Sequence, residues 1–260
     1  MRKVRPPAEY RVEALARGLA VLDAFAGDVT KLGVTEVAQI VGLPTSTTFR
    51  LLATLEVAGY LERLPDGEFR PSIRVLRLGD AALRGSDLVE VSSGLLRNLA
   101  ESTGLSVNLA VLNGNHVLYL IRQRGAALVP ANRQVGSTLP AVYSSLGKAM
   151  LAYLEPTDLE KRLAGWDFSR GPSTRSVLSL AALKKQLAQV RRDGYSTQDE
   201  EIAPGLRAIA APVRNFDGSI VAAVNLASTS SEIDLDLLIN KFKQPLLEVA
   251  GDLSRRLGNG

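Results

Sequence analysis

Apolar residues spaced three and four positions apart predict three helices within the first sixty residues. The first stripe runs from Val12 to Ala26, and a shorter one covers residues 34–41 with Thr35 as its expected N-cap. A third helix is expected from Thr45 onward. Its apolar side carries Leu51, Leu52, Leu55 and Ala58. Each of the three helices therefore has one side that is expected to be buried.

The second and third helices are joined by Gly42-Leu43-Pro44, a tight turn that contains a glycine. A short helix, a three-residue turn and a longer helix form the helix-turn-helix arrangement. Thr48 falls on the apolar side of the third helix and is expected in the core. The other residues at the start of this helix face outward, where hydroxyls suit phosphate oxygens and Arg50 suits a guanine edge or a phosphate.

Residues 59–72, GYLERLPDGEFRPS, predict a strand, a turn at Asp66-Gly67 and a second strand. A hairpin that directly follows a recognition helix is a wing. Arg63 and Arg70 flank its turn, and each either contacts DNA or is a surface residue without a role in binding. The pattern predicts a winged helix-turn-helix that binds double-stranded DNA. The DNA-contacting residues that we expect are Thr35, Thr45, Ser46, Thr47, Phe49, Arg50 and Arg63.

Residues 74–84 form a further helical stretch with Val75, Leu78 and Ala82 on one stripe. This stripe has little to pack against in its own chain, so it predicts a dimer. Gly85-Ser86 ends the stretch, which we interpret as a linker. The expected domains are a winged helix-turn-helix over residues 1–72, a linker helix over 73–85 and a second, larger domain over 86–260.

The second domain is predicted to be α+β, because its strands arrive in pairs with helices between them. Two β-rich runs flank a turn at residues 113–116, where His116 is expected as an exposed turn residue. Two more apolar strands meet at Asp217-Gly218, and residues 128–143 are expected to form an irregular loop that curls over a cavity. Helices are expected over 87–104, 145–154, 156–164, 180–193 and 233–257. The result is an antiparallel sheet covered by helices.

Composition narrows the chemistry that the chain can support. With no cysteine and a single histidine, it has neither a disulfide nor the ligands of a thiolate or multi-histidine metal centre. The net charge of +4 permits nucleic-acid binding without requiring it. The basic segment Met1–Arg11 is either a solvated tail or an arm that contacts DNA. It lacks the apolar run of a signal peptide, and no stretch is long enough to span a bilayer, so we expect a cytoplasmic protein without a membrane partner.

The segment SSLGKAM, residues 144–150, permits an enzymatic interpretation, because Ser145 and Lys148 have the S-x-x-K spacing of serine–lysine hydrolases. Such enzymes also carry S-D-N and K-T-G motifs, and neither occurs in this chain. A phosphate-binding Walker loop fails as well, since Ala149 stands in place of the serine or threonine and Val142 in place of the first glycine. Lys148 is therefore expected at the surface. No catalytic residue, metal or cofactor is expected, and the hydrolase stays only as the alternative function.

The acidic run Asp199-Glu200-Glu201 is a second candidate for chemistry. With one histidine and no cysteine, the chain lacks the usual partners of a metal or acid–base site. We therefore expect Glu200 and Glu201 in a solvated loop, with Asp199 facing inward.

Four segments carry a resemblance to a known family: RGLAVLDAF (17–25), TEVAQIVGLPTSTTFRLLATLEVAGYLER (35–63), VGSTLPAVYSSLGKAMLAYL (135–154) and DEEIAPGLRAIAAPVRN with GSIVAAVNLAS (199–228). In these segments, their order and their spacing, the whole chain resembles the IclR family of bacterial transcriptional regulators. The resemblance implies a winged helix-turn-helix, a linker helix and a GAF-like domain that binds a small organic metabolite. It also implies that operators are bound by dimers or dimers of dimers.

The resemblance further implies an effector pocket on a face of the sheet, with mostly apolar walls and a few polar groups. Backbone N–H groups at the helix start near Ser145 are expected to receive a carboxylate. Ala208, Ala227 and Asn225 make this pocket roomier and less polar than in relatives that bind small acids. ANRQVGSTLPA and GLRAIAAPVR look similar to the aromatic-acid and β-ketoadipate branch, which favours an aromatic or related carboxylate. The implied effector-binding residues are Leu128, Ala131, Leu139, Ser145, Leu146, Asp199, Leu206, Ala208, Asn225 and Ala227.

Overall fold

The computed structural model describes residues 11–26, 29–125 and 134–258. Contacts between Cα atoms divide the chain into two compact units, one up to Ala82 and the other from Leu83 onward. Each unit has its own hydrophobic core. The unit boundary falls inside helix α4 (Arg74–Arg84), the helix expected from the stripe at residues 74–84.

The first unit is a three-helix core with a two-stranded hairpin. Its elements are α1 (Glu13–Asp23), η2 (Ala24–Ala26), α2 (Val34–Val41), α3 (Thr45–Val57), β1 (Leu61–Arg63) and β2 (Phe69–Pro71). The two strands pair antiparallel, with Leu61 opposite Pro71. The buried core consists of Val21, Phe25, Leu32, Val37, Leu52, Leu61 and Phe69. The winged helix-turn-helix predicted from the sequence is thus confirmed.

Two local details differ from the predictions. The N-cap of α2 is Gly33 rather than Thr35, because the Glu36 carboxylate accepts a hydrogen bond of 2.7 Å from the Gly33 backbone N–H. Thr35 therefore lies inside the first turn, where its side chain is exposed. Ala58 is also exposed, because it follows the last residue of α3.

The second unit is a six-stranded sheet in the order β5-β4-β3-β8-β7-β6, and neighbouring strands pair antiparallel throughout. In chain order the strands are β3 (Ser106–Asn113), β4 (His116–Gln123), β5 (Thr138–Pro140), β6 (Ser196–Asp199), β7 (Leu206–Arg214) and β8 (Ile220–Thr229). The α+β prediction is confirmed, although the segments that form β5 and β6 were expected to be irregular rather than strands.

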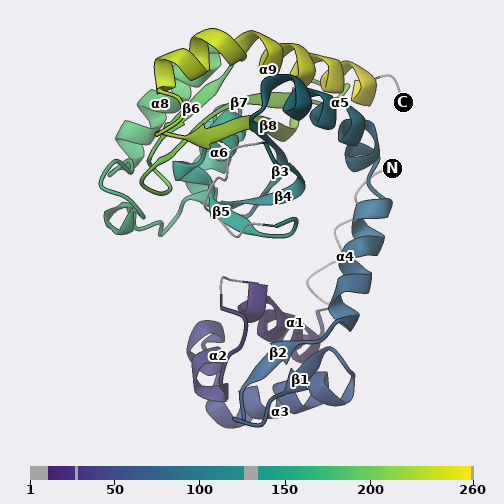
Figure 1. The fold of residues 1–260 in the computed structure, drawn as a ribbon. Coiled ribbons are helices and arrows are strands. Elements are labelled where there is room, and N and C mark those ends of the chain that lie inside the picture. Colours follow the sequence, from purple (N-terminus) through teal and green to yellow (C-terminus); the bar gives the residue numbers. More distant parts are fainter. Residues whose placement is uncertain (1–10, 27–28, 126–133, 259–260) are drawn as a thin grey trace. The chain divides into compact units, whose positions relative to one another are not determined.

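Helices cover both faces of this sheet (Figure 1). On one face α5 (Asp87–Thr103) and α9 (Leu235–Gly258) pack over Leu109, Ile209 and Leu226. The other face carries η3 (Ala141–Tyr143), α6 (Ser145–Leu151), α7 (Pro156–Arg162), η4 (Phe168–Arg170) and α8 (Leu180–Asp193). Within the described residues, no helix combines the length and the apolar character needed to cross a bilayer.

Candidate functional site

The start of α3 presents a polar surface in the first unit. Thr45, Ser46 and Arg50 are exposed, and Phe49 is 42% exposed. Thr48 is buried, as expected, and its hydroxyl donates to the Pro44 carbonyl oxygen at 3.1 Å. Thr47 is half-buried. This end of α3 therefore offers hydroxyls, an aromatic ring and a guanidinium group to a ligand.

Arg63 on β1 joins the hairpin to this surface. Its guanidinium carbon lies 5.6 Å from the centre of the Phe49 ring and 5.4 Å from the centre of the Phe69 ring. Cation–π contacts of this length hold an exposed arginine in place. Arg70, by contrast, donates to the Glu62 carboxylate at 2.8 and 2.9 Å. The two arginines that flank the wing are thus in different environments.

A cavity lies on the α6 side of the sheet in the second unit, and its floor begins with a row of polar side chains. Arg122 on β4, Asn108 on β3 and Asn225 on β8 are direct neighbours across these strands. Asn108 Nδ2 donates to Asn225 Oδ1 at 2.8 Å, and Arg122 Nε donates to Asn108 Oδ1 at 3.0 Å. The Arg122 guanidinium carbon also lies 5.4 Å from the centre of the Tyr119 ring. Both amides are nearly fully buried, so the row is held rigidly.

A second row crosses the same floor two residues further along the strands. It consists of Ser106, Ala227, Ala208 and Gln198, which pair across β3, β8, β7 and β6. The two alanines leave space in the middle of the floor. Gln198 Nε2 donates to the Leu206 carbonyl at 3.2 Å, but Gln198 Oε1 is buried without a hydrogen-bond partner among the described residues. An unpaired buried oxygen of this kind favours a ligand that brings a donor.

Apolar side chains form the walls of the cavity. Leu139, Ile202 and Leu206 line it, together with the Tyr119 ring. Its volume is about 460 Å³, including the part that opens to solvent. Apolar walls with a few fixed polar groups are typical of sites for small organic ligands.

The last wall of the cavity is the start of α6. Ser144 caps this helix, with its hydroxyl oxygen accepting from the Gly147 backbone N–H at 2.8 Å, and both Ser144 and Ser145 line the cavity. The helix approaches η3 so closely that a side-chain carbon at Gly147 would overlap the backbone of Ala141. Glycine at this position therefore lets the capped helix end sit against the sheet.

The structure brings six of the predicted effector-binding residues to the cavity: Leu139, Ser145, Leu206, Ala208, Asn225 and Ala227. Leu146 is fully buried and does not line it, and Asp199 lies outside it. Leu128 and Ala131 lie outside the described residues. Sequence reasoning missed Ser106, Asn108, Tyr119, Arg122, Ser144, Gln198 and Ile202.

Lys148 is not at the surface, contrary to the prediction. It is 2% exposed, and its ammonium group lies 2.5 Å from a carboxylate oxygen of Glu201, which is 7% exposed. The predicted solvated position of Glu201 is therefore also wrong. Burial lowers the pKa of Lys148 and raises the pKa of Glu201. The pair joins α6 to the β6–β7 loop, one residue before the cavity-lining Ile202.

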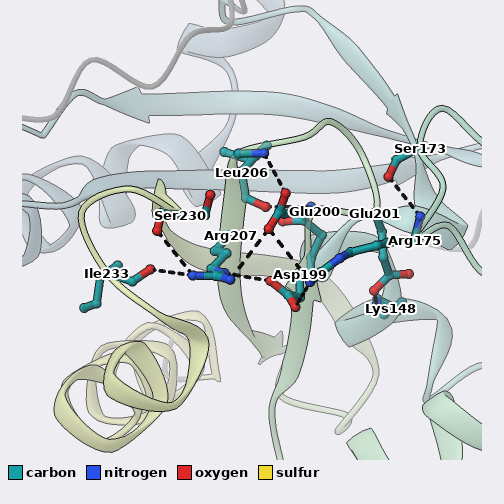
Figure 2. A network of polar contacts seen from close by, with 12 residues as sticks. Lys148, Ser173, Arg175, Asp199, Glu200, Glu201, Leu206, Arg207, Ser230 and Ile233 are labelled. Atoms are coloured by element: carbon teal, nitrogen blue, oxygen red, sulfur yellow. Dashed lines mark hydrogen bonds and ion pairs between the residues drawn. The ribbon is translucent and has the colours of Figure 1, made fainter.

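The β6–β7 loop is fixed by further polar contacts, shown in Figure 2. Asp199 pairs with Arg207 at 2.7 Å and also with Arg175. Arg207, at the start of β7, donates to the Ile233 carbonyl at 3.1 Å, which links this end of the strand to the segment before α9. Glu200 has a φ of 58°, a left-handed conformation that is unusual for a residue with a side chain. Asp199 thus belongs to this network, and Glu200 belongs to it as well rather than to a solvated loop.

His116 is half-buried and opens β4, rather than lying exposed in the turn. Its ring centre is 5.8 Å from that of Trp166 in an edge-on arrangement. Burial lowers the pKa of His116. Within the parts of the chain that the structure describes, no three acidic or histidine side chains gather as a metal-binding group.

Comparison with known proteins covers both units. Residues 14–65 match the IclR helix-turn-helix domain, and residues 80–255 match the bacterial transcriptional regulator IclR C-terminal domain. The HTH-type transcriptional regulator XynR of Escherichia coli is 30% identical over 249 residues, which are 95% of this chain and 98% of that protein. The transcriptional repressor IclR of Escherichia coli is 32% identical over 255 residues, 97% of this chain and 92% of that protein.

A solved structure is similar over nearly the whole chain. It is the crystal structure of an IclR homolog from Microbacterium hydrocarbonoxydans complexed with 4-hydroxybenzoate. The sequences are 29% identical, the TM-score is 0.73, and the match covers 95% of this chain and 100% of that one.

Proposed function

The chain belongs to the IclR family of bacterial transcriptional regulators, and from this premise we propose that it binds an operator through α3 and the wing while a small carboxylate in the cavity changes its affinity for DNA. The observation that carries the DNA contact is the exposed start of α3, with Arg50 and the Phe49–Arg63 contact beside it. Exposed hydroxyls and a guanidinium group at the start of a helix suit phosphates and base edges in a major groove.

The protein acts as a homodimer or a dimer of dimers. Helix α4 has no buried residue, and on its predicted apolar stripe Leu78 is 59% exposed and Ala82 is exposed as well, which supports a second copy as the cover of this stripe. A dimer presents two recognition helices to half-sites about 34 Å apart or a multiple of that. Regulation of this kind places the protein in the cytoplasm with its operator. The basic segment Met1–Arg11 lies outside the described residues, and its contact with DNA stays a prediction.

Replacing Arg50 by alanine should weaken specific operator binding by about 1–3 kcal/mol, because a base or phosphate contact is lost while the fold is kept. The operator is selected from random duplexes, and affinity is measured by fluorescence anisotropy at one fixed salt concentration. Arg70→Ala is the matched control, since Arg70 is already paired with Glu62 in the same unit. Equal affinities for Arg50→Ala and the unaltered protein would remove Arg50 from the DNA contact.

The effector that we propose is a small aromatic carboxylate. The apolar walls fit a ring, and Gln198 Oε1 needs a donor such as a hydroxyl group. The relative crystallised with 4-hydroxybenzoate supports this class. Of the residues predicted from the sequence, we propose that Ser145 and Asn225 supply polar contacts and that Leu139, Leu206, Ala208 and Ala227 form the walls.

A true effector at about 100 times its dissociation constant should stabilise the protein by about 2.7 kcal/mol, because it binds only the folded state. A thermal-shift screen of carboxylate metabolites measures this. Asn225→Leu should abolish the shift, since it removes the amide at the end of the polar row and fills part of the cavity. A shift that survives in Asn225→Leu would mean that the hit binds elsewhere.

The protein is not an enzyme in this proposal. A serine–lysine hydrolase needs the lysine amine next to the serine hydroxyl as a base. Here the Lys148 ammonium is paired with Glu201 instead, and Ser145 lies at the cavity wall. The alternative hydrolase is therefore not favoured.

A further inference from the structure

The cavity carries its charge at one end only. Among the described residues that line it, Arg122 alone has a charged side chain; the others are apolar, hydroxyl, phenol or amide groups. A carboxylate that enters an apolar cavity loses its hydration and needs a compensating charge or several strong donors. The position of Arg122 therefore has consequences for how an anionic ligand lies in the cavity.

Arg122 is held in place before any ligand arrives. Its Nε donates to Asn108 Oδ1, and its guanidinium group stands against the Tyr119 ring. The hydrogen bond from Asn108 to Asn225 then turns the Asn225 carbonyl toward β3, which leaves the Asn225 amide nitrogen as the group that can donate to a ligand. A fixed guanidinium group costs less entropy on binding than a mobile one.

The start of α6 is a weaker anchor than the sequence indicated. The helix is only seven residues long, and the Ser144 hydroxyl already accepts from the Gly147 N–H. A short helix has a small dipole that acts only over its first turn. Arg122, on β4, lies across β3, β8 and β7 from Gln198 on β6, so the two groups mark opposite ends of the floor.

We propose that Arg122 is the residue that recognises the carboxylate of the effector, so that the effector lies along the floor with its carboxylate toward the Arg122–Asn108–Asn225 row. Its apolar body then lies over Ala208 and Ala227, and a hydrogen-bond donor at its far end meets Gln198. The class of ligand is a monocarboxylate with an apolar body and a hydroxyl or amino group at the other end. This orientation rests on the proposed function, because it presumes a carboxylate effector in this cavity.

The test compares an acid with its neutral amide in three forms of the full-length protein. Calorimetry at pH 7 measures binding of 4-hydroxybenzoate and 4-hydroxybenzamide to the unaltered protein, to Arg122→Gln and to Arg124→Gln. Arg124 is exposed, just beyond the end of β4, and loses the same charge in the control variant. The unaltered protein and Arg124→Gln should bind the acid more tightly than the amide. Arg122→Gln should weaken binding of the acid about 10- to 100-fold and change binding of the amide about 3-fold or less.

The amide shows whether the cavity of Arg122→Gln is intact, because its binding needs the walls and Gln198 but not the charge. If Arg122→Gln keeps the preference for the acid, the orientation is overturned, and the carboxylate sits at the start of α6. Equal binding of acid and amide by the unaltered protein overturns it as well. If the unaltered protein binds neither compound, the aromatic carboxylate of the proposed function fails, and the orientation fails with it.

Discussion

Replacing Glu201 by alanine should lower the free energy of unfolding of the second unit by about 3–5 kcal/mol, because Lys148 would remain buried without its carboxylate. Urea unfolding followed by tryptophan fluorescence measures this directly. Trp166 is the single tryptophan of the chain and packs beside Tyr143, with ring centres 6.1 Å apart, so its signal reports on the second unit.

Two further variants separate the loss of stability on breaking the ion pair from the net contribution of the intact pair to the free energy of unfolding. Replacing both partners, Lys148→Met with Glu201→Leu, should recover most of the loss, since a buried ion pair is often no better than apolar residues of similar volume. Glu160→Ala removes the exposed partner of Lys184 and should have a much smaller effect on stability, because solvent screens an exposed ion pair. A cost for Glu201→Ala as small as that of Glu160→Ala would contradict a buried, charged Lys148.

Replacing Gly147 by alanine should destabilise the same unit by about 3 kcal/mol, because the new methyl group would overlap backbone atoms of Ala141. Backbone atoms cannot swing aside as a flexible side chain does, so η3 and α6 must separate. Since Ser144 and Ser145 line the cavity at this junction, effector binding should weaken together with stability. Urea unfolding and calorimetry on one sample measure both effects.

Gly94 provides the matched control for this substitution. It lies within α5, is exposed, and has no atom within 4 Å of the place where a side-chain carbon would stand. Alanine at Gly94 should therefore stabilise the unit by up to about 1 kcal/mol, since it lowers the entropy of the unfolded chain and favours helix. If both substitutions have the same sign, the close approach of η3 and α6 does not limit position 147.

The features that sequence reasoning predicted well are local ones. The helices of the first unit follow from apolar spacing within each segment, and the wing follows from one turn, Asp66-Gly67. The error at Thr35 is local too: the cap of α2 uses the Glu36 carboxylate and the Gly33 backbone rather than a threonine hydroxyl. The strands β5 and β6 have three and four residues, too few to show an alternating pattern.

The features that it missed depend on residues far apart in the chain. Lys148 and Glu201 are 53 positions apart, and no local pattern indicates that one will neutralise the other. Without that pairing, a lysine in a helix is reasonably expected in solvent. The polar floor of the cavity could be predicted in part from the sequence. Ser106 and Asn108 are two residues apart on a strand whose other residues are apolar up to Leu112, and this spacing turns both side chains toward one face. Their neighbours on β8 became known only with the register of the sheet.

The pairing of β3 with β8 also sets the order in which the chain acquires structure during synthesis. Asn108 meets Asn225 across 117 positions, so the centre of the sheet closes only when nearly the whole protein has left the ribosome. The core of the helix-turn-helix, in contrast, is complete by Phe69. Domains fold from the N-terminus onward during translation, so the helix-turn-helix unit of this regulator forms well before its effector-binding unit. A chain whose synthesis stops early would have the helix-turn-helix unit but no effector-binding unit. It would be a DNA-binding fragment that no metabolite can control.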